Sequence, residues 1–263
     1  MVKRFRNRAI NTLGKINAAI TPSSLLRTQS ARLSLTSLFL LTFVSTLIST
    51  PTYAEPPIAA FQQQFRLSSS GIPFSIKADR RLEYRGDGIW AMTVSADNWL
   101  GEVEETTIFS WQQCTPLSNY YGYKREGMGK KRHAEMFFNH QAGQARVIRA
   151  AKESHYPINN STTDKLSHTL ALQCLLSKGS NDLSMDIADE RGLDHIEYRH
   201  AGEETLNTPA GKFKTVKIER IREPGSSRQT SMWFAKNHGY ALVQMVQDED
   251  DKQHTMTLKK FSR

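Results

Sequence analysis

Histidine and acidic side chains are the residues of this chain whose types and spacing could support metal binding. His195 and His200 are five residues apart, so in an extended strand they point to opposite faces and cannot hold one ion together. His133 and His140, seven apart, meet the same objection. The acidic turn at 248–251 lacks the spacing and the central glycine of a helix-loop-helix calcium loop. The sequence therefore predicts no metal site.

Catalysis has equally little support in the residue pattern. Glu102, Glu104 and Glu105 could supply a carboxylate for glycoside hydrolysis, but nothing fixes a partner carboxylate at the separation that the reaction needs. The sequence contains no nucleophile elbow, no dinucleotide-binding glycine motif and no P-loop. We therefore expect a protein without catalytic residues and without a cofactor. A hydrolase whose site assembles from distant residues is the weaker alternative.

Apolar and aromatic residues offer a different kind of site. Such side chains most often pair across strands or fill a core. If a curved sheet were only partly filled by a helix, however, the same apolar face would line a pocket. On this interpretation Trp90, Met92, Trp111 and Leu170 are the candidate residues that would line a ligand pocket.

The two cysteines, Cys114 and Cys174, leave two alternatives open. In an oxidising compartment they could form a disulfide that closes a long loop and stabilises the fold. Alternatively, Cys174 is a buried apolar residue on a helix and Cys114 is a half-exposed thiol at the end of a strand.

Short alternating segments separated by turn residues account for most of the chain after residue 54. The clearest spans 73–85, where Phe74, Ile76, Ala78, Leu82 and Tyr84 share one predicted core face. Similar runs recur up to the C-terminus, which predicts a mainly β fold with antiparallel connections. A single helix is predicted over 163–178, with hydroxyl and carboxylate residues at its start and a glycine just past its end.

The first 54 residues have the composition of an export signal. Seven basic residues and no acidic residue precede Glu55, and an apolar run at 33–49 leads to small residues at 52 and 54. We predict a signal peptide with a long basic first part over 1–54, cleaved after Ala54, and one mature domain over 55–263. The expected route is general secretion to the periplasm. An uncleaved leader would instead anchor the chain in the membrane.

The basic character of the chain belongs largely to this leader. The whole chain has 35 Lys and Arg against 26 Asp and Glu. Removing the seven basic residues of the leader leaves 28 against 26, a formal balance of +2. Nucleic-acid binding needs a concentrated basic face on the folded part, so we expect no nucleic-acid partner.

Several short motifs, in this order, resemble DUF3108, a family of exported bacterial proteins whose function is unassigned. The resemblance covers roughly 61–261, but Asn139 stands where the family leads us to expect aspartate, and the cysteine pair is not a family feature. It implies a periplasmic, strongly curved antiparallel sheet, a half-barrel or open barrel meander, with one helix packed on its concave side. The motifs are Asp164-Lys165-Leu166-Ser167, Thr208-Pro209-Ala210-Gly211-Lys212-Phe213, Met232-Trp233-Phe234-Ala235, and Gly239 leading into Leu242-Val243.

Two further hypotheses about function follow, besides the hydrolase. The first is a non-enzymatic periplasmic protein that binds an apolar or lipid-like ligand in envelope maintenance. The second is a structural or interaction domain with a filled core that binds an envelope protein through a strand edge or loop. An apolar cavity of several hundred Å³ would favour the first.

Overall fold

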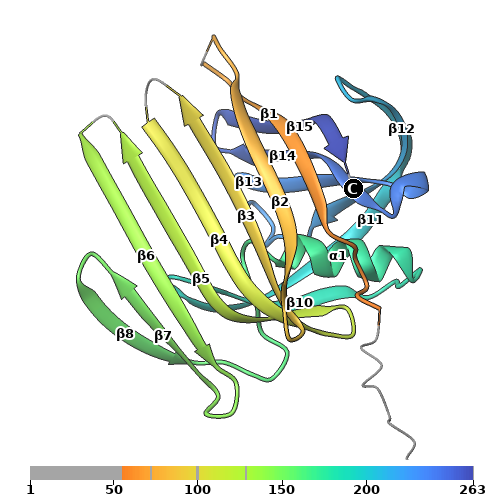
Figure 1. The fold of residues 1–263 in the computed structure, drawn as a ribbon. Helices are drawn as coiled ribbons and strands as arrows, with labels where there is room; N and C mark the ends of the chain where they lie inside the picture. Colours follow the sequence, from red (N-terminus) through yellow and green to blue (C-terminus); the bar gives the residue numbers. More distant parts are fainter. Residues whose placement is uncertain (1–54, 72, 99–100, 128, 263) are drawn as a thin grey trace, which may run out of the picture. The chain divides into compact units, whose positions relative to one another are not determined.

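The computed structural model describes residues 55–262, except 72, 99, 100 and 128. The leader predicted over 1–54 lies outside the described residues. Within the described part, fifteen strands form one sheet, and the chain also forms one α-helix and one 3-10 turn (Figure 1). The elements are β1 Phe61–Ser69, β2 Ile76–Gly86, β3 Ile89–Asn98, β4 Gly101–Gln112, β5 Thr115–Gly127, β6 Lys130–Asn139, β7 Gln144–Arg149, β8 Lys152–Pro157, β9 Thr163–Asp164, α1 His168–Ser177, β10 Leu183–Asp189, β11 Gly192–Thr208, β12 Gly211–Arg220, β13 Arg228–Ala235, η1 Lys236–His238, β14 Ala241–Glu249 and β15 Lys252–Ser262.

The sheet is two meanders joined at its centre. Strands β1 to β8 follow one another outwards to one edge, while β9 to β15 run back from the other edge to the middle, where β15 pairs with β1. All neighbouring strands are antiparallel except the short β9, which pairs with β10 in parallel. This arrangement confirms the predicted mainly β class and its antiparallel connections.

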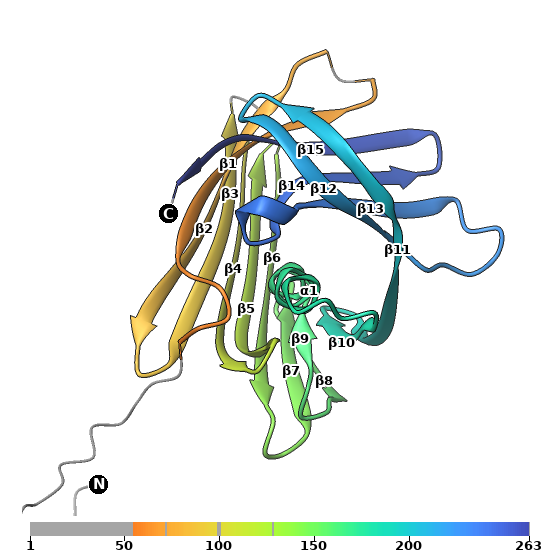
Figure 2. The same cartoon turned by 90° about the vertical axis from the view of Figure 1, so that its right-hand side faces the viewer.

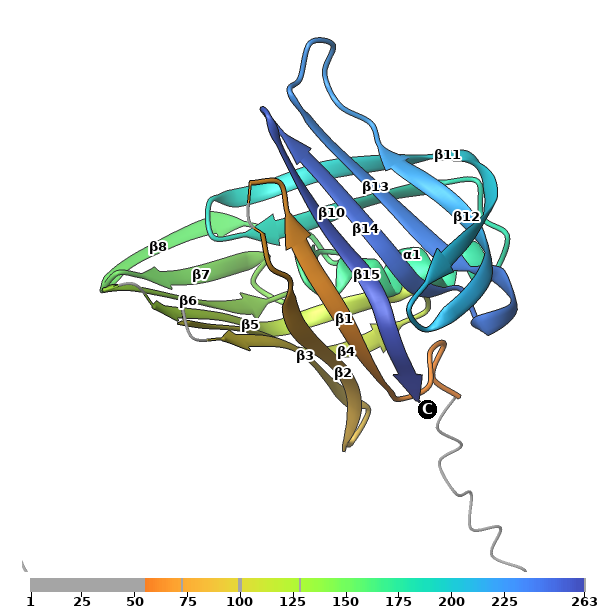
Figure 3. The ribbon, with the colours of Figure 1, turned by 90° about the horizontal axis from the view of Figure 1, so that it is seen from above.

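Strong curvature brings the two halves of the sheet to face each other, with α1 between them (Figures 2 and 3). The end of β8 also meets β10, the strand next to the other edge. Tyr156 Oη, at the end of β8, donates to the carbonyl oxygen of Asp189 at 2.7 Å. Asn159 Nδ2 donates to Asp186 Oδ2 at 2.6 Å. These hydrogen bonds join the end of β8 and the segment after it to β10 on the other side of the curved sheet.

The side-chain alternation predicted for 73–85 is correct in the middle of β2 and wrong at both ends of the predicted range. Ala78 and Leu82 are buried, as predicted, whereas Phe74 and Tyr84 are 37% and 50% exposed. Both lie where the chain leaves the covered part of the sheet. Arg80, on the same face, is only 3% exposed and donates to Gln63 and Thr169, each at 2.8 Å. Burial lowers the pKa of Arg80 to about 9, so the guanidinium is still charged at neutral pH.

The helix begins later than predicted, at His168 instead of 163. Thr163 and Asp164 pair with β10 in parallel, and the Asp164 carboxylate accepts the amides of Leu166 and Ser167 at 2.7 and 2.9 Å. The hydroxyl and carboxylate residues that resemble a helix cap therefore form a strand end and a turn. The predicted end is correct, since Gly179 follows the last turn with φ +69°.

Helix α1 is buried on nearly every side because it packs against both halves of the sheet. Leu172 and Leu176 belong to a core cluster built with β10 to β14, whereas Leu170 and Cys174 belong to a cluster built with β1 to β4. The concave side is thus filled along the length of the helix. None of the helices that the structure describes is long and apolar enough to cross a membrane.

Candidate functional site

A pocket of about 780 Å³ opens beyond the C-terminal end of α1. We call it the aromatic pocket. Two of the four predicted lining residues, Trp90 and Trp111, belong to its walls. Its other lining residues are Glu55, Pro56, Pro57, Tyr84, Gly88, Gln113 and Lys178. Rings and proline faces make up most of this surface, which suits an apolar ligand.

The β2–β3 hairpin and the end of β4 position the aromatic rings. Asp87 and Gly88 both have positive φ, at 51° and 75°, which closes the hairpin tightly and sets Tyr84 opposite Trp90. The two rings lie 5.3 Å apart. Trp111 stands edge-on to Phe109 at 5.2 Å, and Phe109 is fully buried. Core residues therefore hold the pocket walls from behind.

The indole nitrogen of Trp111 is an unsatisfied donor in the wall of this pocket. Trp111 Nε1 is buried and has no hydrogen-bond partner. Leaving such a donor unsatisfied costs about 1–3 kcal/mol. Neighbouring atoms cover this nitrogen, so a bound molecule would not reach it directly. The exposed polar groups in the lining are Glu55, Gln113 and Lys178.

Cys114 and Cys174 are joined as a disulfide, with their Cα atoms 5.4 Å apart. Cys114 lies in the short turn between β4 and β5, three residues after Trp111, and Cys174 lies in α1. The bond therefore ties the strand end that carries Trp111 to the helix whose C-terminal side leads to Lys178. It closes a loop across 60 residues, which corresponds to about 4 kcal/mol of stabilisation in the chain-entropy model.

The other two predicted lining residues, Met92 and Leu170, lie elsewhere. Both are 0% exposed in the core cluster that also contains Leu82 and Phe109, and neither lines the aromatic pocket. The prediction placed Met92 on the apolar face of the curved sheet, and it packs there in the same cluster as Leu170. What the sequence could not predict is that α1 fills this side, because that depends on how closely two distant segments approach.

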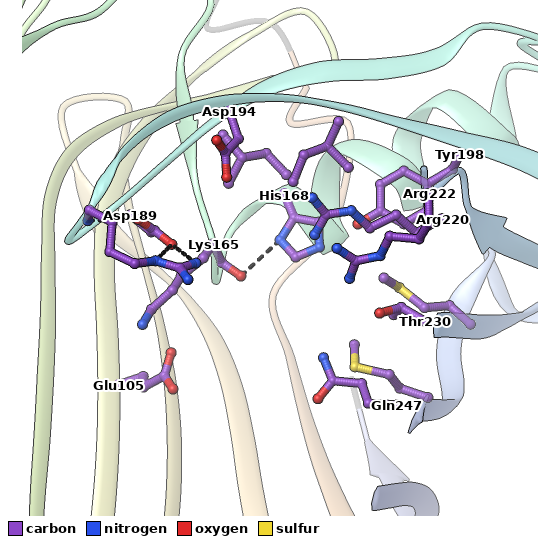
Figure 4. Close-up of a pocket in the computed structure, with 15 residues that line it drawn as sticks. Glu105, Lys165, His168, Asp189, Asp194, Tyr198, Arg220, Arg222, Thr230 and Gln247 are labelled. Atoms are coloured by element: carbon purple, nitrogen blue, oxygen red, sulfur yellow. Dashed lines mark hydrogen bonds and ion pairs between the residues drawn. The ribbon is translucent and has the colours of Figure 1, made fainter. Parts of the chain in front are cut away.

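A second cavity, of about 310 Å³, lies near the N-terminal end of α1 (Figure 4). We call it the cationic cleft. Strand β12 ends at Arg220, and Arg222 follows two residues later. The residues that characterise the lining of the cationic cleft are His168, Arg191, Asp194, Tyr198, Arg220 and Arg222.

Burial shifts the titration of several groups that line the cationic cleft. It lowers the pKa of His168 to about 4, so the ring is neutral at neutral pH. His168 Nδ1 lies 2.8 Å from the carbonyl oxygen of Lys165 and must carry the proton that it donates. Burial raises the pKa of Tyr198 to about 12. Burial first, and then the neighbouring charge of Arg220, lowers the pKa of Arg222.

Sequence reasoning missed the cationic cleft, although one signal was present. Arg220 and Arg222 are two residues apart, so an extended chain directs both side chains to the same side of the chain. In the sequence they stand between Glu219 and Glu223, which makes local ion pairs the natural interpretation. In the structure, Glu219 binds Lys217 and Arg199 at 2.7 and 3.1 Å instead.

The histidine pairs considered for metal binding do not converge in the structure. His195 Nδ1 lies 2.7 Å from Asp186 Oδ1, and this bond raises the pKa of His195. His200 lies near the carbonyl oxygen of Ser180. In the described part of the chain, no group of three or more His, Cys, Asp or Glu could hold a metal ion.

Comparison with known proteins supports the fold and gives no activity. The model of a family described as proteins of unknown function, DUF3108, matches residues 67–259. A β-barrel-like protein from Brucella abortus, with the DUF1849 domain of unknown function, has a similar fold at a TM-score of 0.54 and 10% identity. The match covers 78% of this chain and 98% of that one.

A Bacteroides fragilis protein, described as exported and as having a YmcC-like fold, matches at a TM-score of 0.32 and 13% identity. This match covers 79% of this chain and 98% of that one. At this TM-score the similarity gives no support to a shared fold. Among curated proteins, none matches the chain significantly.

Proposed function

The chain belongs to DUF3108, a family of proteins of unknown function, and from its geometry we propose that it is an exported, non-catalytic binding protein for an apolar, lipid-like ligand. The observation that carries this proposal is the aromatic pocket of about 780 Å³ lined by Trp90 and Trp111. Pockets of several hundred Å³ with apolar walls and a few placed polar groups are typical of small-molecule sites.

The chemistry of the pocket defines the ligand class. Aromatic rings and proline faces would contact a hydrocarbon chain. Gln113, which is exposed in the lining, would donate from its side-chain amide to an acceptor oxygen, such as that of an ester or a carboxyl group. Lys178 is exposed at the rim, where its charge would remain in water beside a polar end of the ligand. An acyl chain with an oxygen-bearing end matches these three features.

Calorimetric titration with monolaurin, a neutral acyl ester, tests this proposal. We expect the purified protein to bind it. Gln113→Ala removes the exposed amide donor, so it should weaken binding about fivefold, the equivalent of one hydrogen bond of about 1 kcal/mol. Trp111→Ala should weaken it further. Ile221→Ala, which changes an exposed apolar residue outside the pocket, is the matched control and should bind as the wild type does.

Native mass spectrometry of protein purified from its own cells provides a second test. Retention of an acyl-containing molecule would support the proposal. A chain that is consistently empty and has no affinity for monolaurin would refute it.

Export to the periplasm is part of the proposal and has its own test. It is supported by the basic stretch, apolar run and small residues that precede Glu55. Intact-mass analysis of protein from the periplasmic fraction should give a chain that begins at Glu55. Recovery of full-length chain from the cytoplasm alone would overturn this part and leave the ligand proposal standing.

A second candidate function is an interaction domain that binds an envelope protein. It is favoured by the filled concave side, where α1 residues such as Leu170 and Leu172 are fully buried. A partner would add to the first part of the β8 edge, before Tyr156, where the side chains of residues 152–155 are exposed. Chemical crosslinking in cells would distinguish the two functions. Links from Lys152 to one envelope protein, with no retained ligand, would favour the interaction domain.

A further inference from the structure

The two arginines of the cationic cleft have no acidic partner in the described part of the chain. Arg220 and Arg222 both line the cavity, and their side chains form no ion pair or hydrogen bond with a described carboxylate (Figure 4). Arg222 Nε is buried without any acceptor. A guanidinium group carries five donors, so these two side chains present many unused donors to the cleft.

The carboxylates around the cleft are largely engaged by other groups. The Asp189 carboxylate accepts hydrogen bonds from Nε of Arg191 at 3.0 Å and from the backbone amide of Arg191 at 2.7 Å. Glu105 accepts from the hydroxyl of Tyr121 at 2.9 Å. Glu249, in the adjoining cavity, pairs with Arg228.

Asp194 is the remaining acidic group in the lining, and it is exposed. The two guanidinium groups therefore have one unengaged carboxylate in the same lining, and it is open to water. Like charges this close in a partly enclosed space repel each other, which an anion between them would relieve.

We propose that Arg220 and Arg222 bind the oxyanion group, phosphate or carboxylate, of a small organic ligand. The planar fork of arginine matches both groups through paired hydrogen bonds. Thr230 and Gln247 also line this cavity and could complete the set of polar contacts.

The remaining lining of the cleft indicates that the ligand carries an apolar part. Ile187, Ile196, Met232 and Met245 line the same cavity as the two arginines. An adjoining cavity of about 300 Å³ shares Arg191, Arg220 and Arg222 with it, so the combined space exceeds that needed by a bare inorganic anion. This site lies at the opposite end of α1 from the aromatic pocket and does not depend on the function proposed for that pocket.

A broader basin leads towards the cationic cleft. It has a volume of about 1130 Å³ and shares Lys165, Arg191 and Gln247 with the cleft. Arg125 and Arg132, paired opposite each other on β5 and β6, line this basin. Positive charge concentrated in a concave surface attracts anions and raises their rate of association.

Calorimetric titrations of the purified protein with three probes test the proposal. We expect hexyl phosphate to bind, inorganic phosphate to bind more weakly, and neutral hexanol not to bind. Arg220→Gln and Arg222→Gln should each weaken hexyl phosphate binding at least tenfold, and binding should weaken as salt rises. Arg66→Gln removes an exposed arginine from β1 and is the matched control, with wild-type affinity expected.

Thermal unfolding separates a ligand site from a structural role. Without ligand, Arg220→Gln and Arg222→Gln should unfold at or above the wild-type temperature, because each removes repulsion between like charges. Hexyl phosphate should raise the unfolding temperature of the wild type and leave that of the double variant unchanged.

Three results would overturn the proposal. They are equal binding by the double variant and the wild type, binding of hexanol as tight as that of hexyl phosphate, and the absence of binding of either phosphate at millimolar concentration. Vesicles containing phosphatidylglycerol identify the source of the oxyanion. Cosedimentation that depends on both arginines would indicate a lipid headgroup, whereas binding of free hexyl phosphate alone would indicate a soluble ligand.

Discussion

Replacing Asp164 should destabilise the fold more than replacing any surface acid. This carboxylate is fully buried and accepts five hydrogen bonds. Oδ1 accepts the backbone amides of Leu166 and Ser167 at 2.7 and 2.9 Å. Oδ2 accepts the hydroxyls of Thr107, Ser118 and Ser167 at 2.5, 2.5 and 2.7 Å. One side chain thus links β4, β5 and the turn that leads into α1.

The expected loss follows from what the substitution leaves behind. Thr107, Ser118 and Ser167 are all fully buried, and a buried polar group without a partner costs about 1–3 kcal/mol. Part of this loss is offset because a charge no longer has to be buried. We expect Asp164→Ala to lower the free energy of unfolding by about 4 kcal/mol. Asp164→Asn keeps the shape and one acceptor oxygen, so its loss should be about 2 kcal/mol.

Equilibrium unfolding in urea, followed by circular dichroism, measures both losses. Asp251→Ala, in the exposed β14–β15 turn, is the control and should change the free energy by less than about 0.5 kcal/mol. If Asp164→Ala loses less than about 1 kcal/mol, or if the asparagine variant is as unstable as the alanine variant, the carboxylate is not the link that we describe.

Two further predictions concern the disulfide and the buried histidine. Replacing both Cys114 and Cys174 by serine should lower the free energy of unfolding by about 4 kcal/mol, since the unfolded chain gains the freedom of a 60-residue loop. Identical melting with and without a reductant that cleaves the bond would contradict this. Burial lowers the pKa of His168 from 6.5 to about 4, so between these values the unfolded chain binds a proton that the folded chain does not. Stability should therefore fall by about 2–3 kcal/mol as the pH drops from 6.5 to 4. His168→Gln should flatten that part of the pH profile, and an unchanged slope in this variant would show that His168 does not cause it.

Local patterns in the sequence predicted the strands, the turns and the existence of one helix. Alternation of apolar and polar side chains is a property of neighbouring residues, so it identified the buried face around Ala78 and Leu82. The same logic failed for Thr163 and Asp164. Their hydroxyl and carboxylate groups suit a helix cap or a buried hydrogen-bond network equally well, and β4 and β5 decide between the two.

The sequence by itself determined the mainly β class, the alternation of the strands, and the residues Trp90 and Trp111 as candidates for a pocket wall. Only the tertiary structure decided that Met92 and Leu170 are core instead of pocket, because that depends on how closely α1 approaches the sheet. Only the tertiary structure decided that Arg220 and Arg222 form no ion pair with Glu219, their neighbour in the chain, which pairs with Lys217 and Arg199. Strand geometry directs neighbouring side chains to opposite faces, and the curvature of the sheet then determines which distant groups they meet.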